Sequence, residues 1–504
     1  MHEAAELGTE LTPIIQRRRA EELIPGLAVG IVDGQGRTWS AGFGTLAEGD
    51  PRPVETTTMF SVQSTSKLIT STAILAGVDR GLVSLESTVS ELLPGFAVRS
   101  GFQSNPERTM TLRDLLHHTA GFTHEAPVGS NYRVGREGFA AHVASIEQTW
   151  LRFPVGHHHE YSNLGVDLAG AILQRVLGMR FAEAVRSLLF APLGMRKSTF
   201  ATSVIQRTRD RARGSWRNAT RPLPVRIPMV PSGGLYTSVD DALQIVRLHL
   251  DDGAPIMLPG THAELSTLPQ VVPNQAEGYG LCVYVDRWGG VPVRHHGGSG
   301  FGFHSQLFWL PEQRLGGVVL TNSIDHDLQN ELSRLIVRTV AGGSAPERAA
   351  RAVVVSAPPD AAGRYIGRLG DLVDVSYESG TAVVTGEPGL VDDRFRFLPG
   401  PSGATHYLQN LRDGSVRYRT EPADRTPLTL PPEFPGRYEA RMSGTAVGDY
   451  EIHDSTRGPF IRLPRGPELA LYPQADGFRS STGETLATGP NGLTYAEIPL
   501  YPTS

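Results

Sequence analysis

The order of strand-like and helical segments in residues 1–342 limits the fold more than any other feature of this chain. Strand-type runs lie at 26–43 and again at 279–321, and the segment between them is helical and rich in loops. A helix over residues 11–23 precedes the first strands, and another at about 326–341 follows the last ones. Strands from both ends around a helical insert predict one antiparallel sheet with helices packed on it, an α+β domain.

Beyond Gly342 the sequence changes to short β-rich runs separated by Gly, Asp and Pro, which predicts an all-β tail. The segment 362–367 (AGRYIG) recurs loosely at 435–440 (PGRYEA), which indicates two small barrels related by an internal repeat. Closure of such barrels would remove exposed strand edges. The predicted parts are a first domain at 1–342, a linker at 343–360, and barrels at 361–430 and 431–504.

Composition excludes several kinds of partner. The 504 residues carry a formal net charge of −5, which gives no electrostatic reason to expect nucleic acid or an anionic membrane as a partner.

Cys282 is the single cysteine, so no intramolecular disulfide is expected. The acidic start has no apolar signal region, and no run approaches the roughly 20 apolar residues of a membrane span. We therefore expect a cytoplasmic protein, and leave open whether it forms a homo-oligomer.

Lysine is almost absent, and one of the two lysines stands three residues after a serine, as Ser64 and Lys67. Arginine supplies the other positive charges, but a guanidinium cannot give up its proton, whereas a desolvated lysine can. Apolar residues at helical spacing follow, so both side chains are expected near the start of one helix. The pair favours an activated serine nucleophile over a capping serine beside a solvated lysine.

Two further fragments carry polar groups suited to a cleft. Tyr161-Ser162-Asn163 lies at a junction between a loop and a helix, where a phenol can act as a base and an amide can hold a carbonyl. The alternative is a helix cap with a packed tyrosine. The second fragment, 295–300 (HHGGSG), lies between strand-type runs and lets a substrate approach a strand edge. Its alternative is a Gly-rich hairpin with a surface histidine.

Together the three fragments resemble the serine β-lactamase and penicillin-binding-protein superfamily, particularly its class C-like branch of D-aminopeptidases, esterases and acyltransferases. That family carries Ser-x-x-Lys, Tyr-x-Asn and Lys-Thr-Gly or His-x-Gly motifs. The matching residues here are Ser64 and Lys67, Tyr161 and Asn163, and His296 and Gly298. We choose His296 over His295 because Gly302-Phe303 then falls where the family has its Gly-aromatic pair.

The resemblance implies acyl transfer through a covalent ester of Ser64, with Lys67 or Tyr161 as the base. It implies that Asn163 and Gly298 contact substrate, and that His296 supplies a mostly neutral donor in place of a cation. The backbone N–H groups of Ser64 and Ser299 would form the oxyanion hole. The tail is similar to the accessory barrels of D-aminopeptidases and to lipocalin-like tails of related esterases and peptide cyclases.

The implied substrate is a small molecule or short peptide, with a D-amino-acid amide or an ester as the first candidates. The alternatives are an acyltransferase or a cyclising thioesterase, then a DD-carboxypeptidase or β-lactamase, and last a binding protein without catalysis. No phosphate-binding loop appears, so no nucleotide cofactor is expected. Residues 157–160 (HHHE) are read as a polar rim of the cleft, and no metal site is expected.

Overall fold

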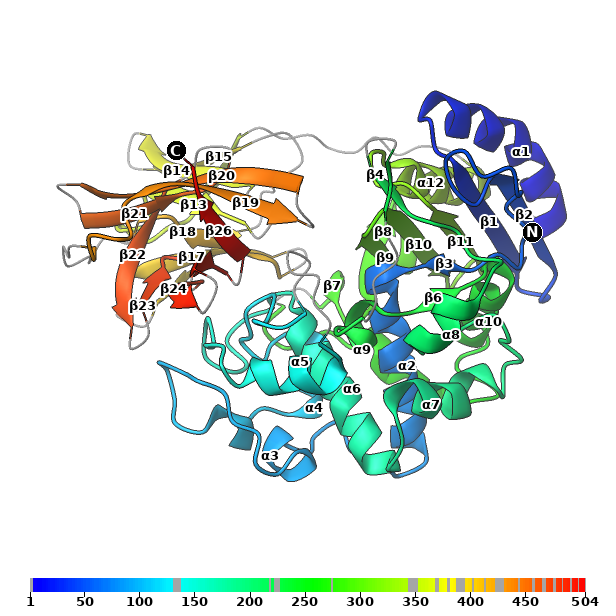
Figure 1. The fold of residues 1–504 in the computed structure, drawn as a ribbon, viewed down its shortest axis with the longest axis horizontal. Helices are drawn as coiled ribbons and strands as arrows, with labels where there is room; N and C mark the ends of the chain where they lie inside the picture. Colours follow the sequence, from blue (N-terminus) through cyan, green and yellow to red (C-terminus); the bar gives the residue numbers. More distant parts are fainter. Residues whose placement is uncertain are drawn as a thin grey trace.

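A seven-stranded antiparallel sheet forms the centre of the first domain in the computed structural model (Figure 1). Its strand order is β2-β1-β11-β10-β9-β8-β7, so the two ends of the domain meet where β1 pairs with β11. The strands are β1 (Gly26–Asp33), β2 (Thr38–Gly44), β7 (Gly278–Tyr279), β8 (Tyr284–Trp288), β9 (Val291–Gly300), β10 (Phe303–Leu310) and β11 (Leu315–Thr321). This arrangement confirms the sheet predicted from the sequence.

The structure describes residues 3–129, 137–216, 219–221, 227–272, 275–342, 352–367, 371–378, 381–386, 395–400, 403–411, 414–421, 430–442, 445–455, 458–464, 468–474, 477–482, 484–489, 492–496 and 498–503. Half of the predicted linker, residues 343–351, therefore lies outside the described residues.

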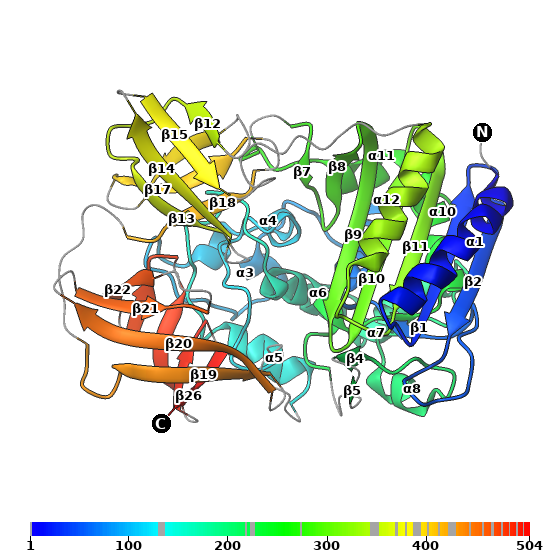
Figure 2. The same ribbon diagram turned by 90° about the horizontal axis from the view of Figure 1, so that it is seen from above.

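Helices cover both faces of the central sheet, which explains why every residue of β1 is buried. Leu27, Val29 and Ile31 join one core with α1 (Ala4–Glu21) and α12 (Leu328–Ala341). Ala28 and Val32 point the other way, into the core that contains α2 (Ser66–Asp79) and α10 (Val239–Leu250). The alternation follows from the two-residue period of a strand. Figure 2 shows α1 and α12 lying across the same face.

The first helix begins earlier than the sequence pattern predicts. Its buried residues include Ala4 and Leu7 as well as Leu11 and Ile15, so the apolar stripe extends about two turns before the expected start. Within the middle of the domain, α2 packs against α6 (Asn163–Leu177) and α9 (Val230–Gly233). No helix among the described ranges combines the length and apolar character needed to cross a bilayer.

The tail forms two antiparallel β units, as predicted. The first is a seven-stranded sheet ordered β12-β15-β14-β13-β18-β17-β16, and the second is a closed barrel of β19 to β26 in sequence order. The strand β12 (Ala352–Val355) pairs with β15. It lies inside residues 343–360, the range predicted as linker, so that part of the prediction is wrong. The other strands are β13 (Gly363–Ile366), β14 (Leu372–Glu378), β15 (Thr381–Gly386), β16 (Phe395–Pro399), β17 (Thr405–Asn410), β18 (Val416–Arg419), β19 (Gly436–Met442), β20 (Thr445–Ser455), β21 (Gly458–Arg462), β22 (Glu468–Gln474), β23 (Gly477–Ser480), β24 (Thr485–Gly489), β25 (Gly492–Tyr495) and β26 (Ile498–Pro502).

The repeated Gly-Arg-Tyr segments occupy equivalent places in the two units. Each opens the first strand after the Pro-containing joint, as β13 and β19. The Tyr365 hydroxyl donates to the carbonyl of Ala361 at 2.7 Å, and the Tyr438 hydroxyl donates to the carbonyl of Phe434 at 2.9 Å. Each tyrosine thus bonds to the carbonyl four residues before it, which holds its strand against the preceding joint. Both views show the tail beside the helical region that holds α4 (Leu112–His117) and α5 (Phe139–Ile146), away from α1.

Candidate active site

Ser64 lies in the tight turn η1 (Gln63–Thr65), between β3 (Phe60–Ser61) and α2. The helix itself begins at Ser66, two residues after the serine. Gln63 has a φ of 48°, in the left-handed region that is costly for a non-glycine residue and that clusters at functional sites. Every residue from Thr58 to Gly77 is buried except Ser64, which is partly exposed. The turn therefore lifts one hydroxyl out of an otherwise buried segment.

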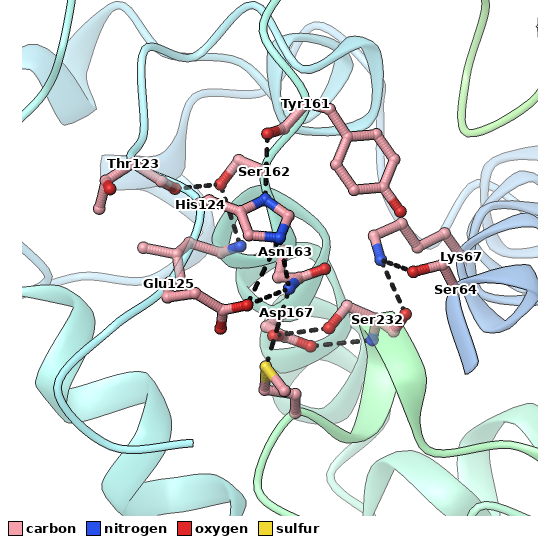
Figure 3. Close-up of polar contacts among 12 residues, drawn as sticks. Ser64, Lys67, Thr123, His124, Glu125, Tyr161, Ser162, Asn163, Asp167 and Ser232 are labelled. Carbon is pink, nitrogen blue, oxygen red and sulfur yellow. Dashed lines mark hydrogen bonds and ion pairs between the residues drawn. The ribbon is translucent and has the colours of Figure 1, made fainter. Parts of the chain in front are cut away.

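Lys67 is 0% exposed, and its ammonium group lies against the serine. Its Nζ donates to Ser64 Oγ at 3.1 Å and to the carbonyl of Ser232, in α9, at 2.9 Å. The same Nζ lies 4.8 Å from the centre of the Tyr161 ring, and Figure 3 shows the Tyr161 hydroxyl directed toward Lys67 and Ser64. The structure thus brings together the three groups predicted to form the acyl-enzyme.

The carbonyl that holds Lys67 is itself anchored by a buried ion pair. Asp167, on α6, accepts the Ser232 N–H at 2.9 Å and the Ser232 hydroxyl at 2.9 Å. His142, on α5, lies 2.8 Å from the same carboxylate, and both side chains are 0% exposed. Burial alone would lower the pKa of His142, but the charge of Asp167 and its hydrogen bond outweigh burial, so the pKa is raised. Three elements thereby fix the position of the Lys67 ammonium group.

Tyr161 precedes α6, and Ser162 rather than Asn163 caps that helix. The Ser162 hydroxyl accepts the Leu164 N–H at 3.1 Å and donates to the carbonyl of Thr123 at 2.6 Å. The Asn163 Nδ2 donates to Glu125 Oε1 at 3.1 Å (Figure 3). The amide that the sequence assigns to substrate is thus hydrogen bonded to a buried carboxyl, and a contact of Asn163 with substrate stays a prediction.

Glu125 was not found by sequence reasoning, because nothing in its local pattern marks it. Its side chain is 3% exposed, and burial raises its pKa to about 8 despite the opposing effects of His142 and Lys67. The carboxyl is therefore largely protonated at pH 7 and is held directly beneath the Tyr161 to Asn163 segment.

Replacing Glu125 by glutamine is expected to reduce the pH dependence of stability. In the folded protein the pKa is about 8 against an ordinary 4.5, so its contribution to stability is greatest below pH 4.5 and is lost as the pH rises through 8. Glutamine keeps an acceptor for Asn163 and does not titrate. Urea unfolding at pH 5, 6.5 and 8 should show a smaller fall for the variant than for the wild type. Equal falls in the two proteins would contradict the buried, protonated carboxyl.

The two adjacent histidines of β9 point to opposite faces of the sheet. His295 stacks on Tyr284 with ring centres 5.0 Å apart and lies 3.5 Å from Asp286. His296 faces the catalytic side, where its ring centre is 6.4 Å from that of Tyr161. The structure thus places His296, the residue chosen from the sequence, beside the other predicted site residues.

Both ring nitrogens of His296 bond within the protein. Nε2 lies 2.7 Å from the Tyr279 hydroxyl, and Nδ1 lies 2.7 Å from the carbonyl of Gly297. Burial, and then the charge of Lys67, lower the pKa of His296 to about 3, so the ring is neutral at pH 7. Since a carbonyl only accepts, Nδ1 carries the proton and Nε2 accepts from Tyr279. The ring proton that the sequence assigns to substrate is directed at Gly297.

Gly298 brings β9 into contact with the serine turn. A Cβ atom built on Gly298 would lie 2.0 Å from the carbonyl oxygen of Val62 and 2.9 Å from the Ser64 nitrogen. No side chain fits there, so the residue must be glycine. Ser299, the next residue, is exposed and lies in register with His304 of β10. The backbone of β9 therefore runs beside Ser64 at Gly298, and an oxyanion hole with Ser299 stays a prediction.

Residues 157–160 fit the expected polar rim only in part, because His157 and His159 are partly exposed and His158 and Glu160 are buried. His158 is 0% exposed and stacks on Phe153 at 3.7 Å between ring centres, and its Nε2 lies 3.1 Å from the Tyr418 hydroxyl of β18. Glu160 is buried as well. Apolar packing and contacts with the tail explain the difference.

Of the groups that sequence reasoning missed, Asp167 left a signal, because it is the one charged residue in an apolar helical run from Leu164 to Leu173.

Known proteins resemble this chain in sequence and in fold. A family model described as Beta-lactamase matches residues 11–340. Penicillin-binding protein 4 of Amycolatopsis lactamdurans is 29% identical over 360 residues, which cover 68% of this chain and 90% of that protein. Esterase EstB of Burkholderia gladioli is 27% identical, covering 66% of this chain and 94% of its own length.

A solved structure extends the likeness into the tail. The chain in the crystal structure of SurE is 20% identical in sequence to this one. The two folds superpose with a TM-score of 0.62, over 82% of this chain and 99% of that one. Because the family model ends at residue 340, coverage of this extent includes part of the β tail. At this identity the likeness concerns the fold alone.

Proposed function

Because the chain belongs to the beta-lactamase family of serine hydrolases, we propose that it cleaves small amides or esters through an acyl-enzyme on Ser64. D-amino-acid amides, short D-peptides and simple esters are the substrates we favour. The observation that carries the proposal is the direct contact of 3.1 Å between Lys67 Nζ and Ser64 Oγ, at a partly exposed serine in a buried segment.

The reaction follows from the positions of these groups. Ser64 Oγ forms a bond to the substrate carbonyl carbon, and its proton passes to whichever of Lys67 and Tyr161 is deprotonated, as a neutral amine or a phenolate. The bond to the leaving amine or alkoxide then breaks as the leaving atom takes up that proton. Water adds to the resulting ester, giving up a proton to the same pair, and Ser64 is restored when the acid leaves. The N–H groups of Ser64 and Ser299 would stabilise the negative charge on the carbonyl oxygen in both steps.

The state of His296 supports substrates without a free carboxylate next to the cleaved bond. A β-lactam or a peptide ending in a D-alanine carboxylate gains from a cation at this position on β9. Here the position holds a neutral ring whose two nitrogens bond to Tyr279 and Gly297. The ring has no charge to offer an anion, which disfavours the carboxypeptidase and β-lactamase activities and favours amides and esters.

A substrate panel with wild-type protein and Ser64→Ala tests the proposal. The panel holds D- and L-amino-acid p-nitroanilides, p-nitrophenyl esters, a chromogenic cephalosporin and a D-alanyl-D-alanine peptide. We expect turnover of anilides or esters and labelling of Ser64 by a fluorophosphonate, both absent in the variant. Failure to label the wild type would overturn the proposal in favour of a binding protein, and cleavage confined to the carboxylate-bearing substrates would overturn the substrate class. Adding a competing amine and analysing the products separates hydrolysis from acyl transfer.

A further inference from the structure

Arg152 is a buried cation at the place where all three parts of the chain meet. Its side chain is 5% exposed, and it lies in the segment that leads to the Tyr161 motif. Its Nε and Nη2 donate to the carbonyl of Thr482, in the second barrel, at 2.9 and 2.6 Å. Its guanidinium carbon lies 4.7 Å from the ring centre of Tyr418, in the first β unit. A buried charge requires partners, and most of those partners come from the tail.

Glu484 supplies the main countercharge from the second barrel. One carboxylate oxygen, Oε1, lies 3.0 Å from Arg152 Nη1. The other, Oε2, accepts the Thr123 hydroxyl at 2.6 Å. Glu484 thus joins two separate loops of the first domain. Its side chain is only 12% exposed.

Both of these loops hold the Tyr161 to Asn163 segment. The carbonyl of Thr123 accepts the Ser162 hydroxyl at 2.6 Å, and the carbonyl of the next residue, His124, accepts the Asn163 N–H at 3.3 Å. On the other loop, Arg152 Nη1 lies 3.4 Å from Glu160 Oε1, directly before Tyr161. The Thr123 branch therefore contacts the segment that carries the proposed base, and the Arg152 branch contacts Glu160, the residue before that segment.

The backbone of Glu484 is hydrogen bonded within its own barrel. The Ser480 N–H donates to the carbonyl of Glu484 at 2.8 Å, and the Glu484 N–H donates to Ser480 Oγ at 3.2 Å. That hydroxyl also accepts from Tyr495, on β25, at 3.1 Å. These bonds fix the backbone of Glu484 within the barrel, directly before β24.

We propose that Glu484 is a positioning residue for the Tyr161 to Asn163 segment, so that the second barrel completes the active site of the first domain. The proposal rests on the proposed function, since it concerns the alignment of the group that exchanges a proton with Ser64. A carboxylate that serves only to hold the tail in place would affect unfolding and leave the rate of acylation unchanged.

The experiment compares the full-length wild type with Glu484→Gln and Thr123→Val. Glutamine retains the shape of Glu484 and removes its charge, and valine is close to threonine in shape and removes only the hydroxyl. Glu468→Gln is the matched control, because Glu468 lies in the same barrel and pairs with Arg462 at its surface. For each protein we measure the rate of Ser64 labelling by the fluorophosphonate, kcat and KM for the best ester, and the melting temperature.

We expect Glu484→Gln to lower the labelling rate and kcat by about tenfold or more with KM within threefold, as expected for a misplaced proton-transfer group. Thr123→Val should lower both about threefold, and Glu468→Gln should match the wild type. Wild-type labelling rates in Glu484→Gln and Thr123→Val would overturn the positioning role. If Glu484→Gln does not fold, Thr123→Val decides alone by the same criterion. Absence of labelling in the wild type would instead remove the proposed function itself.

Discussion

Lys67→Arg is expected to lower the rate of Ser64 acylation by about 10⁴-fold, at the upper end of what general acid–base catalysis contributes. Lysine can accept the serine proton in its neutral amine form, whereas a guanidinium stays protonated and cannot accept it. It is also larger than the ammonium group, which is 0% exposed between Ser64, the Ser232 carbonyl and the Tyr161 ring. The measurements are the rate of fluorophosphonate labelling and kcat/KM for the best ester.

Lys197→Arg is the matched control, because Lys197 is the other lysine of the chain. Its side chain is 43% exposed and lies 3.8 Å from Asp210, a surface contact that arginine can also make. The control should label at the wild-type rate. An active Lys67→Arg protein would refute proton transfer through this residue.

Asp167→Asn is expected to lower the free energy of unfolding by about 3–5 kcal/mol at pH 6, the usual cost of breaking a buried ion pair. The carboxylate is 0% exposed and binds His142 and both polar groups of Ser232. Asparagine cannot accept from all three donors, and it leaves the buried imidazolium without its countercharge. The Ser232 carbonyl that holds Lys67 should shift as well, so activity should fall with stability.

The loss of stability should depend on pH in a defined direction. Asp167 raises the pKa of His142 above its ordinary 6.5. The pair therefore contributes stability fully below pH 6.5 and loses it as the pH rises through the folded-state pKa. Urea unfolding should show a larger deficit for Asp167→Asn at pH 6 than at pH 8.5, while Asp240→Asn, at a part-buried bond to Ser40, serves as control. An equal deficit at both values would contradict a charged pair.

The fold was predictable where the pattern of apolar residues is local. The strands of the central sheet, the all-β tail and the repeated Gly-Arg-Tyr segments each have periods or turn residues that appear within a few positions. Boundaries were less predictable, because they depend on contacts made elsewhere. Residues 352–355 (AVVV) are a β-branched run of the kind that favours a strand, but its four residues pair only with the distant β15.

The site was predictable to the extent that its chemistry uses short motifs. Ser64, Lys67, Tyr161 and His296 come together as their spacing and the family resemblance imply. The groups that hold them do not follow from spacing, because each contact joins distant parts of the chain. Asp167 meets Ser232 across two helices, and Glu484 meets Thr123 across two domains. The hydrogen bond of His296 to Tyr279 could not be predicted either, since Tyr279 lies on another strand.

Cys282 gives this protein a practical advantage for spectroscopy. It is the single cysteine, it is 0% exposed, and burial raises the pKa of its thiol to about 12. A buried, protonated thiol reacts slowly with maleimides and iodoacetamides. Cysteines introduced at exposed positions such as Leu23 and Tyr501 would therefore take up paired fluorophores with little background. Energy transfer between such dyes would report in solution on whether the tail stays docked on the first domain as substrates bind.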